Sequence, residues 1–566
     1  MSPSLSRSVT GVALTLVLLA GHLLQPAGAA TDAVTALHAL FESEWERALK
    51  EDPETASYLG DDRYNDRWAD RSLDAIAASH AADQAVLTAL ARIDRAALPP
   101  AEQLNYDLFE RQYRVTVEGY AFRQFLIPLN QRGGVQTADE ILEVLRFGNR
   151  DDYDDWLARL RALSTLIAQT EALMRAGIEE GRLLPQVVMQ RVPAQIEKQI
   201  VDDPQTSPFY APFLDFPDSV DARYRKQYAK EARSLIADQI IPAYRGFLKF
   251  VSTTYLPACP DDVGAWLQPD GDRFYAYRVR RFTTTDLSPE QVHRIGLDEV
   301  ERIGAQMDAI MREVGFNGDR NAFFEELRTN PKYYYADGDA LLEAYRALAK
   351  RIDPELPRLF KTLPRLPYGV RPIPDNVAPD TTTAYYLPGA ADGTRAGYFY
   401  VNLYKPETRP KYEMEALSLH ESVPGHHFQI ALAQELGALP EFRKNGWGMT
   451  AFVEGWGLYA ESLGDELGLY QDPYSKFGAL TYEMWRAVRL VVDTGMHYKH
   501  WSRQQAIDYF KAHAAKSELD IVNEIDRYIA WPGQALAYKI GQLKIRELRT
   551  RAEQALGEKF DVETAA

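Results

Sequence analysis

The sequence has very little cysteine, since Cys259 is the only one among 566 residues. One cysteine allows no internal disulfide, so stability must come from an apolar core, which a chain of this length buries readily. Cys259 stands in "LPACPDD", where the prolines and acidic residues do not favour a thiolate. We therefore expect a structural, inert cysteine and not a catalytic nucleophile.

Basic charge is also in short supply. The chain carries 64 Lys and Arg against 81 Asp and Glu, a formal net charge of −17 that is dispersed along the sequence. Proteins that bind nucleic acid present a basic face or tail, so nucleic acid is not expected as a partner. The excess of acidic residues otherwise favours solubility.

Long apolar runs are absent except at the N-terminus. Residues 1–30 contain Arg7, an apolar run from Val9 to Leu24 and small residues that end in Ala-Gly-Ala-Ala. This is the layout of a secretory signal peptide, so we expect a secreted or periplasmic protein without a later membrane span. A membrane anchor is the weaker alternative because the run is short and interrupted. No cysteine follows the run, so a bacterial lipoprotein anchor is not expected.

Several common catalytic motifs are missing. The sequence contains no G-x-S-x-G elbow and no G-x-x-x-x-G-K-[ST] loop, so the usual sequence grounds for a serine hydrolase or a P-loop ATPase are lacking. "GWGMTA" and "GWGLYA" match a loose dinucleotide fingerprint, but neither follows a buried strand. We interpret both as chance matches.

Helical periodicity dominates what is present. Apolar residues at spacings of three and four predict helices over residues 31–60, 72–96, 101–125, 138–182, 223–255, 288–314 and 337–353, and from 412 to the C-terminus. Ser288, followed by Pro289, has the sequence of a helix start. We predict one large helical unit over residues 31–566, either a single body or two lobes around a cleft.

A small sheet is predicted inside this helical chain. Residues 356–410 are rich in Pro, Gly, Thr and Tyr, and "TTTAYYL" and "GYFYVNLY" read as two strands joined by a turn. The second strand, with Tyr400, comes shortly before a histidine-rich helix and would offer its backbone edge to an extended peptide.

The histidine-rich segment is "ALSLHESVPGHHFQ". In the zinc motif H-E-x-x-H, two histidines at i and i+4 share one helical face and the glutamate acts as general base. Here Pro424 occupies the i+4 position from His420, and a straight helix would keep His426 and His427 away from the same ion. Because Pro424 and Gly425 break the helix, a bulge can bring one of them beside His420. We favour His426 as the ligand and His427 as a supporting residue; the alternative is an ordinary group of structural histidines.

A third ligand is expected in "TAFVEGWGLYAESLGDELGLY". Glu454 stands among apolar and aromatic residues, where an unpaired carboxylate is costly, and a metal ion would satisfy it. Glu461 is two helical turns further on the same face, and we expect it to orient a metal ligand. The solvated helical carboxylate is the ordinary alternative for either residue.

The same segments resemble a known family. "YEMEALSLHESVPGHHFQ", "FVEGWGLYAE", "RAVRLVVDTGMHYKHWS" and "RYIAWPGQALAYKIG" resemble the DUF885 family of bacterial proteins, and the resemblance covers most of the chain after residue 30. It implies a metallopeptidase of the H-E-x-x-H clan whose fold is similar to that of M32 carboxypeptidases. "FVEGWGLYAE" is also similar to the stretch with the zinc-binding glutamate of M3 oligopeptidases, which supports Glu454 as a ligand.

The prediction is thus a mostly α-helical zinc metallopeptidase with a small inserted sheet beside the active-site helix and an M32/M3-like cleft. We expect about one Zn²⁺ per chain, a catalytic part at about residues 356–566, peptide substrates and Glu421 as general base. The other candidate residues are oxyanion donors and substrate contacts: Tyr538, His497, Arg486, Arg489, Arg527, Tyr400 and Tyr528. The rival function is a peptide-binding protein without turnover, although such a protein would not need Glu421.

Overall fold

The structure is a computed structural model that describes residues 27–375, 377–445 and 448–565. The greater part of the predicted signal peptide, residues 1–26, lies outside the described residues. Within these ranges the chain is mostly α-helical with one small sheet, as the sequence predicts. None of the helices in these ranges is both long and apolar enough to cross a bilayer.

The described part of the first half of the chain consists of helices and the loops that join them. Its α-helices are α1 (Ala27–Glu51), α2 (Pro53–Leu59), α3 (Leu73–Leu90), α4 (Pro100–Tyr120), α5 (Arg150–Glu179), α6 (Gln186–Met189), α7 (Val192–Glu197), α8 (Ala222–Leu235), α9 (Ile241–Phe250), α10 (Leu256–Ala258) and α11 (Gly271–Thr283). Two π-helical turns, Ile236–Ile240 and Val251–Tyr255, join α8, α9 and α10 into one continuous rod, which agrees with the helix predicted over 223–255.

The second half contains the sheet and the remaining helices. The helices are α12 (Pro289–Glu313), α13 (Arg320–Thr329), α14 (Gly338–Ile352), α15 (Met414–Glu421), α16 (His426–Glu435), α17 (Glu441–Lys444), α18 (Thr450–Ser462), α19 (Pro473–His497), α20 (Arg503–His513), α21 (Glu518–Ala530), α22 (Ala537–Leu556) and α23 (Val562–Ala565).

Helix starts follow their capping residues. The predicted start of α12 is confirmed, because the Ser288 side chain accepts from the Gln291 N–H and the Gln291 side chain accepts from the Ser288 N–H. The helix predicted over 138–182 was wrong in its first part. Asn149 and Asp152 form a capping box that starts α5 at Arg150, and a 3-10 segment, Val135–Glu143, precedes it.

The sheet has three strands in the order β1 (Tyr368–Pro372), β3 (Gly397–Val401) and β2 (Ala384–Leu387). β1 pairs parallel and β2 antiparallel to β3. The sequence did not predict β1, since a strand that ends in proline is tolerated only at an edge. The central strand is therefore β3, and the open edges belong to β1 and β2.

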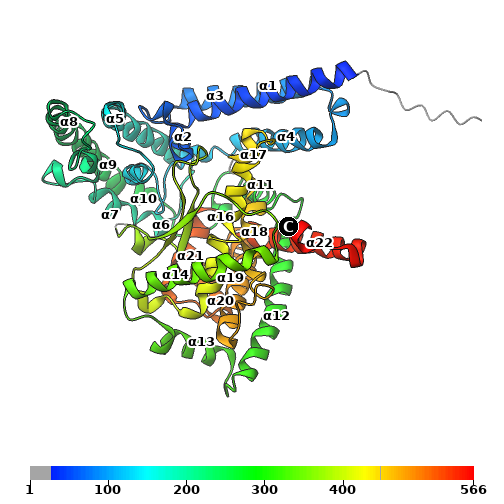
Figure 1. The fold of residues 1–566 in the computed structure, drawn as a ribbon. Helices are drawn as coiled ribbons and strands as arrows, with labels where there is room; N and C mark the ends of the chain where they lie inside the picture. The colour runs from blue at the N-terminus through cyan, green and yellow to red at the C-terminus, as the bar shows by residue number, and fades with distance from the viewer. Residues whose placement is uncertain (1–26, 376, 446–447, 566) are drawn as a thin grey trace, which may run out of the picture.

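One large apolar core runs from Leu129 to Ala535. Figure 1 shows α16, α18 and α19 in the middle of the molecule, between α1, α3 and α4 at one end and α12 and α13 at the other. Helices α18 and α22 cross closely at Gly455 and Gly541, where a Cβ on Gly541 would lie 2.0 Å from the Ala451 carbonyl oxygen. The glycines of "GWGLYA" therefore serve helix packing and not nucleotide binding.

Candidate metal centre

The helix that carries His420 breaks where Pro424 and Gly425 stand. α15 ends at Glu421, Ser422 and Gly425 have non-helical backbone angles, and α16 begins at His426. A Cβ on Gly425 would lie 1.9 Å from the His420 carbonyl oxygen, so only glycine fits this turn. The break brings the imidazoles of His420 and His426 to a centroid distance of 4.6 Å, as the predicted bulge requires.

Helix α18 supplies the carboxylate. Gly457 faces the His420 ring, and a Cβ there would lie 2.7 Å from His420 Cε1, so glycine allows α18 to approach α15. The Trp456 indole N–H donates to the Pro424 carbonyl at 2.7 Å and ties α18 to the break. Glu454, one turn before Gly457, consequently reaches both histidines.

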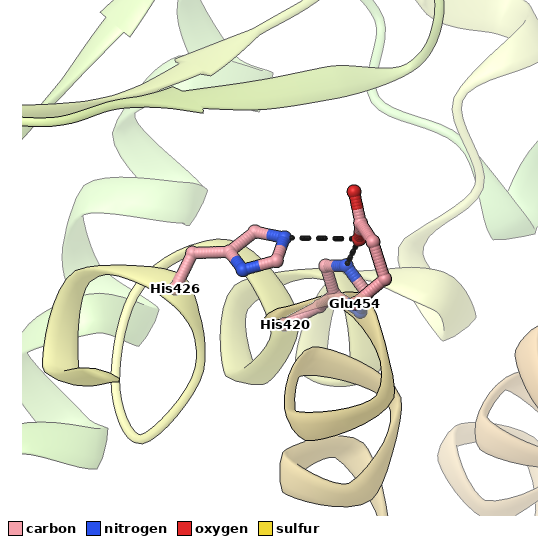
Figure 2. Close-up of side chains that lie close together, drawn as sticks. All are labelled: His420, His426 and Glu454. Atoms are coloured by element: carbon pink, nitrogen blue, oxygen red, sulfur yellow. Dashed lines mark ion pairs between the residues drawn. The ribbon is translucent and has the colours of Figure 1, made fainter. Parts of the chain in front are cut away.

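Three potential ligand atoms converge. Glu454 Oε2 lies 3.5 Å from His420 Nε2 and 3.3 Å from His426 Nε2. The dashed lines in Figure 2 mark these two ion pairs, and the three ligand atoms lie within 4.8 Å of one another. Two ligands at about 2.0–2.1 Å from a tetrahedral zinc are separated by roughly 3.4 Å. The two distances from the carboxylate oxygen to the ring nitrogens are close to this value, so the three side chains fit the ligand set of a metal ion.

The charges of this cluster are strongly coupled. Burial alone would lower the pKa of His420, but the carboxylates of Glu454 and Glu461 raise it to about 9. Burial would raise the pKa of Glu454, but the two imidazoles hold it well below its usual range. Glu454 Oε2 is buried, and no N–H in the described ranges donates a well-directed hydrogen bond to it. A buried carboxylate oxygen that faces two ring nitrogens is a donor set that a divalent cation would satisfy.

Glu461 contacts the second ring nitrogen of His420. Its Oε1 lies 2.8 Å from His420 Nδ1, and the Arg486 guanidinium lies 2.9 Å from the same oxygen. When the Nδ1 proton is donated to Glu461, the Nε2 lone pair of His420 faces Glu454 and His426. Arg486 in turn fixes the Glu461 carboxylate.

His427 points away from the cluster. Its Nδ1 lies 2.8 Å from the Tyr386 hydroxyl and its Nε2 lies 2.9 Å from the Leu366 carbonyl oxygen. Burial lowers the pKa of His427 to about 4, so the ring is neutral at physiological pH. The residue anchors α16 to β2 and to the segment before β1, and the structure brings His426, not His427, to the cluster.

The cluster forms one wall of a cavity of about 490 Å³. Glu421, buried at 8% exposure, lines the same cavity and accepts no hydrogen bond from the described part of the chain. The strand that borders this cavity is β2, through Ala384, Tyr385 and Tyr386. The prediction that β3 presents its edge here was wrong, because β3 is paired on both sides.

Three predicted arginines line the cavity and are paired. Arg489 Nη2 lies 2.9 Å from Glu524 Oε2, Arg527 reaches the same oxygen at 3.3 Å, and Arg486 is held by Glu461. Burial alone would raise the pKa of Glu524, but the surrounding guanidiniums lower it to about 2. These arginines therefore carry counterions already.

Tyr538 also lines the cavity. Its hydroxyl accepts a hydrogen bond from Arg527 at 2.9 Å, and its ring stacks on His420 with a centroid distance of 6.2 Å. Because Arg527 occupies an acceptor site of the hydroxyl, the phenolic proton remains available for a group in the cavity.

Three predicted site residues lie elsewhere. His497 is 1% exposed, and its ring nitrogens contact the Ala265 N–H and the Tyr528 carbonyl oxygen, so it belongs to the core. The Tyr528 hydroxyl is buried between Trp485 and Arg489. Tyr400 lines a neighbouring cavity of about 210 Å³. None of the three lines the cavity beside the histidines, because their neighbours come from segments that are distant in sequence.

The cavity contains residues that the sequence did not single out. Arg132, from a loop of the first half, and Gln534, Trp531 and Tyr385 all line it. No local motif marks Arg132, which stands in "NQRGGVQ" far from the histidines. Cys259, by contrast, behaves as expected: burial raises the pKa of its thiol to about 12, so the sulfur stays protonated.

Similarity to known proteins agrees with this fold. A structure described as a lipoprotein from Colwellia psychrerythraea is 28% identical, with a TM-score of 0.88 over 94% of this chain and 95% of that one. A second, described as a lipoprotein of unknown function from Shewanella oneidensis, is 15% identical with a TM-score of 0.67 over 94% and 95% of the two chains, and shows the fold alone. A comparison with curated proteins gives no match. The family described as "Bacterial protein of unknown function (DUF885)" matches residues 53–564, so the chain belongs to the DUF885 family.

Proposed function

We propose that the chain is a zinc-dependent peptidase that hydrolyses peptides or oligopeptides. The observation that carries this proposal is the convergence of His420, His426 and Glu454 on one wall of a cavity that also contains Glu421. Two imidazoles and a carboxylate suit zinc, although manganese or cobalt can substitute. When bound, such an ion supplies Lewis acidity that acidifies a water molecule and polarises a carbonyl group.

Glu421 would act as the general base. It follows His420 directly in the chain, lines the cavity and has no competing hydrogen-bond donor in the described ranges. A carboxylate in this position accepts a proton from the attacking water and delivers it to the leaving amine. A protein that only bound peptides would gain nothing from a carboxylate here.

Tyr538 would stabilise the oxyanion. Its hydroxyl lines the cavity and accepts from Arg527, which orients the phenolic proton toward the substrate. A donor held in advance where negative charge develops lowers the barrier of acyl transfer. Arg527 is thus a positioning residue for Tyr538.

The edge of β2 would bind the peptide backbone. The Asn402 N–H donates to the Thr383 carbonyl, so these residues form a hydrogen-bonded pair and the next pair, Ala384 with Val401, does not. By this alternation the backbone groups of Ala384 and Tyr386 face the open side of β2. An extended peptide can add there as a further strand within reach of the cavity.

Export from the cytoplasm is part of the proposal. Residues 1–30 have the composition of a signal peptide, and both similar structures are described as lipoproteins. We assign the mature chain to the periplasm or to the medium.

The test uses a mixed peptide library and the purified chain, with zinc and with a chelator. We expect hydrolysis with zinc, none with chelator, and a loss of about 10²- to 10⁴-fold in kcat for Glu421→Gln at equal zinc content. Glu466→Gln, which changes an exposed glutamate paired with Arg549, is the matched control. Peptide binding without hydrolysis in the zinc-loaded wild type would reject the peptidase and favour the peptide-binding alternative.

A further inference from the structure

Arg132 is a cation in the cavity wall that forms no ion pair within the described residues. In the described ranges its guanidinium makes no ion pair or hydrogen bond, its Nε is buried, and it lies over the Trp531 ring with Cζ 5.4 Å from the centroid. Burial and the neighbouring Arg527 lower the pKa of Arg132 to about 10, so it remains charged at neutral pH. A desolvated charge without a partner is costly, and this cost points to an anionic ligand.

The loop that carries Arg132 is fixed in position. Asn130 and Gly133 exchange both backbone hydrogen bonds, and the Gln131 backbone carbonyl accepts from the Gln195 side chain at 2.7 Å. The Gln131 side chain donates to the Asp526 carbonyl at 3.1 Å. Gly134 has φ +151°, and a Cβ there would lie 2.3 Å from Leu129 Cβ. Arg132 is therefore held in place before any ligand binds.

Positive charge is in excess at this end of the cavity. Arg132, Arg489 and Arg527 all act on Glu524, the carboxylate that the latter two share. Arg486 has its own partner in Glu461. Three guanidiniums around one carboxylate leave an excess of positive charge, and of the three only Arg132 has a guanidinium that makes no ion pair or hydrogen bond within the described residues.

The space beyond Arg132 limits how far an anion can go. Arg132 and Tyr385 also line the adjoining cavity of about 210 Å³, which contains Glu140 and Glu143. Burial, with the neighbouring carboxylates of Asp139 and Glu143, raises the pKa of Glu140 to about 7. This acidic wall repels a carboxylate, so an anion that enters from the metal side stops at Arg132. The anionic group is therefore the terminal group of the ligand.

We propose that Arg132 binds the C-terminal carboxylate of the peptide, which makes the enzyme a carboxypeptidase that releases the C-terminal end of its substrate. The inference rests on the proposed peptidase function and names its substrate class. The planar guanidinium binds a carboxylate through two parallel hydrogen bonds. Arg132 is a specificity-determining residue in this account, while Arg489 and Arg527 keep their internal partner Glu524.

Binding to the zinc-loaded Glu421→Gln variant separates recognition from turnover. We expect an N-acetylated pentapeptide with a free C-terminus to bind roughly 10- to 100-fold more tightly than its C-terminal amide. Arg132→Met, added to the same background, should abolish this preference, and Arg132→Lys should restore part of it. The control Arg114→Met, at a side chain 67% exposed on α4, should leave the preference unchanged.

Each other result would overturn the proposal. Equal binding of acid and amide excludes carboxylate recognition, whether or not the Arg132 variants fold. Restoration of tight binding by an internal glutamate in the amidated peptide would assign Arg132 to acidic side chains. If binding requires a free N-terminus on the peptide and is unaffected by C-terminal amidation, the cavity with Glu140 and Glu143 recognises the peptide amine and Arg132 does not bind a carboxylate.

Turnover distinguishes failure of this inference from failure of the proposed function. If the wild type hydrolyses acid and amide at equal rates, the peptidase stands and the C-terminal anchor is wrong. If no peptide is hydrolysed with zinc, the peptidase is wrong, and the binding comparison still decides the role of Arg132.

Discussion

Helices α5 and α19 are both long, but they bury different side chains. The buried face of α5 is apolar, with Trp156, Leu160 and Leu163 among its residues, and Arg159 is its one buried charged side chain. α19 buries Arg486, Arg489 and Asp493 beside its apolar residues. Buried charges are costly unless paired, so a helix that retains several of them is constrained by more than packing. On α19 the two arginines line the cavity.

The largest expected effect on stability comes from the apolar helix. Leu160→Ala removes a fully buried side chain from the core and should lower the free energy of unfolding by about 2–5 kcal/mol. Zinc content and peptide hydrolysis per folded molecule should stay at the wild-type level. Urea denaturation with metal analysis of the folded fraction measures both, and a loss of zinc at full folding would show that α5 also shapes the site.

Asp493 on α19 should make stability depend on pH. It accepts hydrogen bonds from the Tyr275 hydroxyl at 2.6 Å and from the Gly533 N–H at 3.0 Å, and burial raises its pKa from 3.8 to about 7. The folded state holds this proton more tightly than the unfolded state. The resulting stabilisation is full below about pH 4 and is lost as the pH rises through about 7.

The variant Asp493→Asn should lack this loss. Between pH 5 and 8 the wild type should lose roughly 2–3 kcal/mol relative to the variant. Urea denaturation at several pH values measures the difference, to which His497 and other titrating groups contribute equally in both proteins. If the unfolding free energies of the wild type and the variant change with pH in parallel, Asp493 is not a buried carboxyl group that stays protonated in the folded state. The contrast between the buried charges of α19 and the apolar face of α5 would then be weaker.

A smaller effect is expected from the residue that orients His420. Glu461→Gln keeps an acceptor for the His420 N–H but removes the charge that pairs with Arg486. We expect zinc affinity to fall about 10- to 100-fold, as for other partners of metal-binding histidines. Competition with a chelator measures this change, with Glu466→Gln as control. An unchanged zinc affinity would show that Glu461 only forms a structural ion pair with Arg486 and does not support the metal ligand.

The sequence predicted the parts of the site that depend on local geometry. His420, His426 and Glu454 were identified because a Pro-Gly break has one evident effect on helical spacing and because a carboxylate among aromatic residues needs a partner. The general helical class and the start of α12 follow from periodicity and capping in the same way.

The parts that depend on distant contacts were not predictable. Arg132 reaches the cavity only because the loop of residues 130–134 is tied to Gln195 and Asp526. His497 was misassigned because its Nδ1 accepts a hydrogen bond from the N–H of Ala265, which is far away in sequence. β1 was missed because its partner β3 follows it by a crossover and its last residue is proline. Local pattern contains none of this information.

Metal analysis of the purified mature chain, beside Glu454→Gln, tests the central claim most directly. After incubation with zinc and removal of the excess, we predict about one zinc per wild-type chain and much less in the variant. Chelation should empty the wild type and abolish hydrolysis. Near-zero zinc in the wild type, or equal zinc in the two proteins, would contradict the His420–His426–Glu454 site.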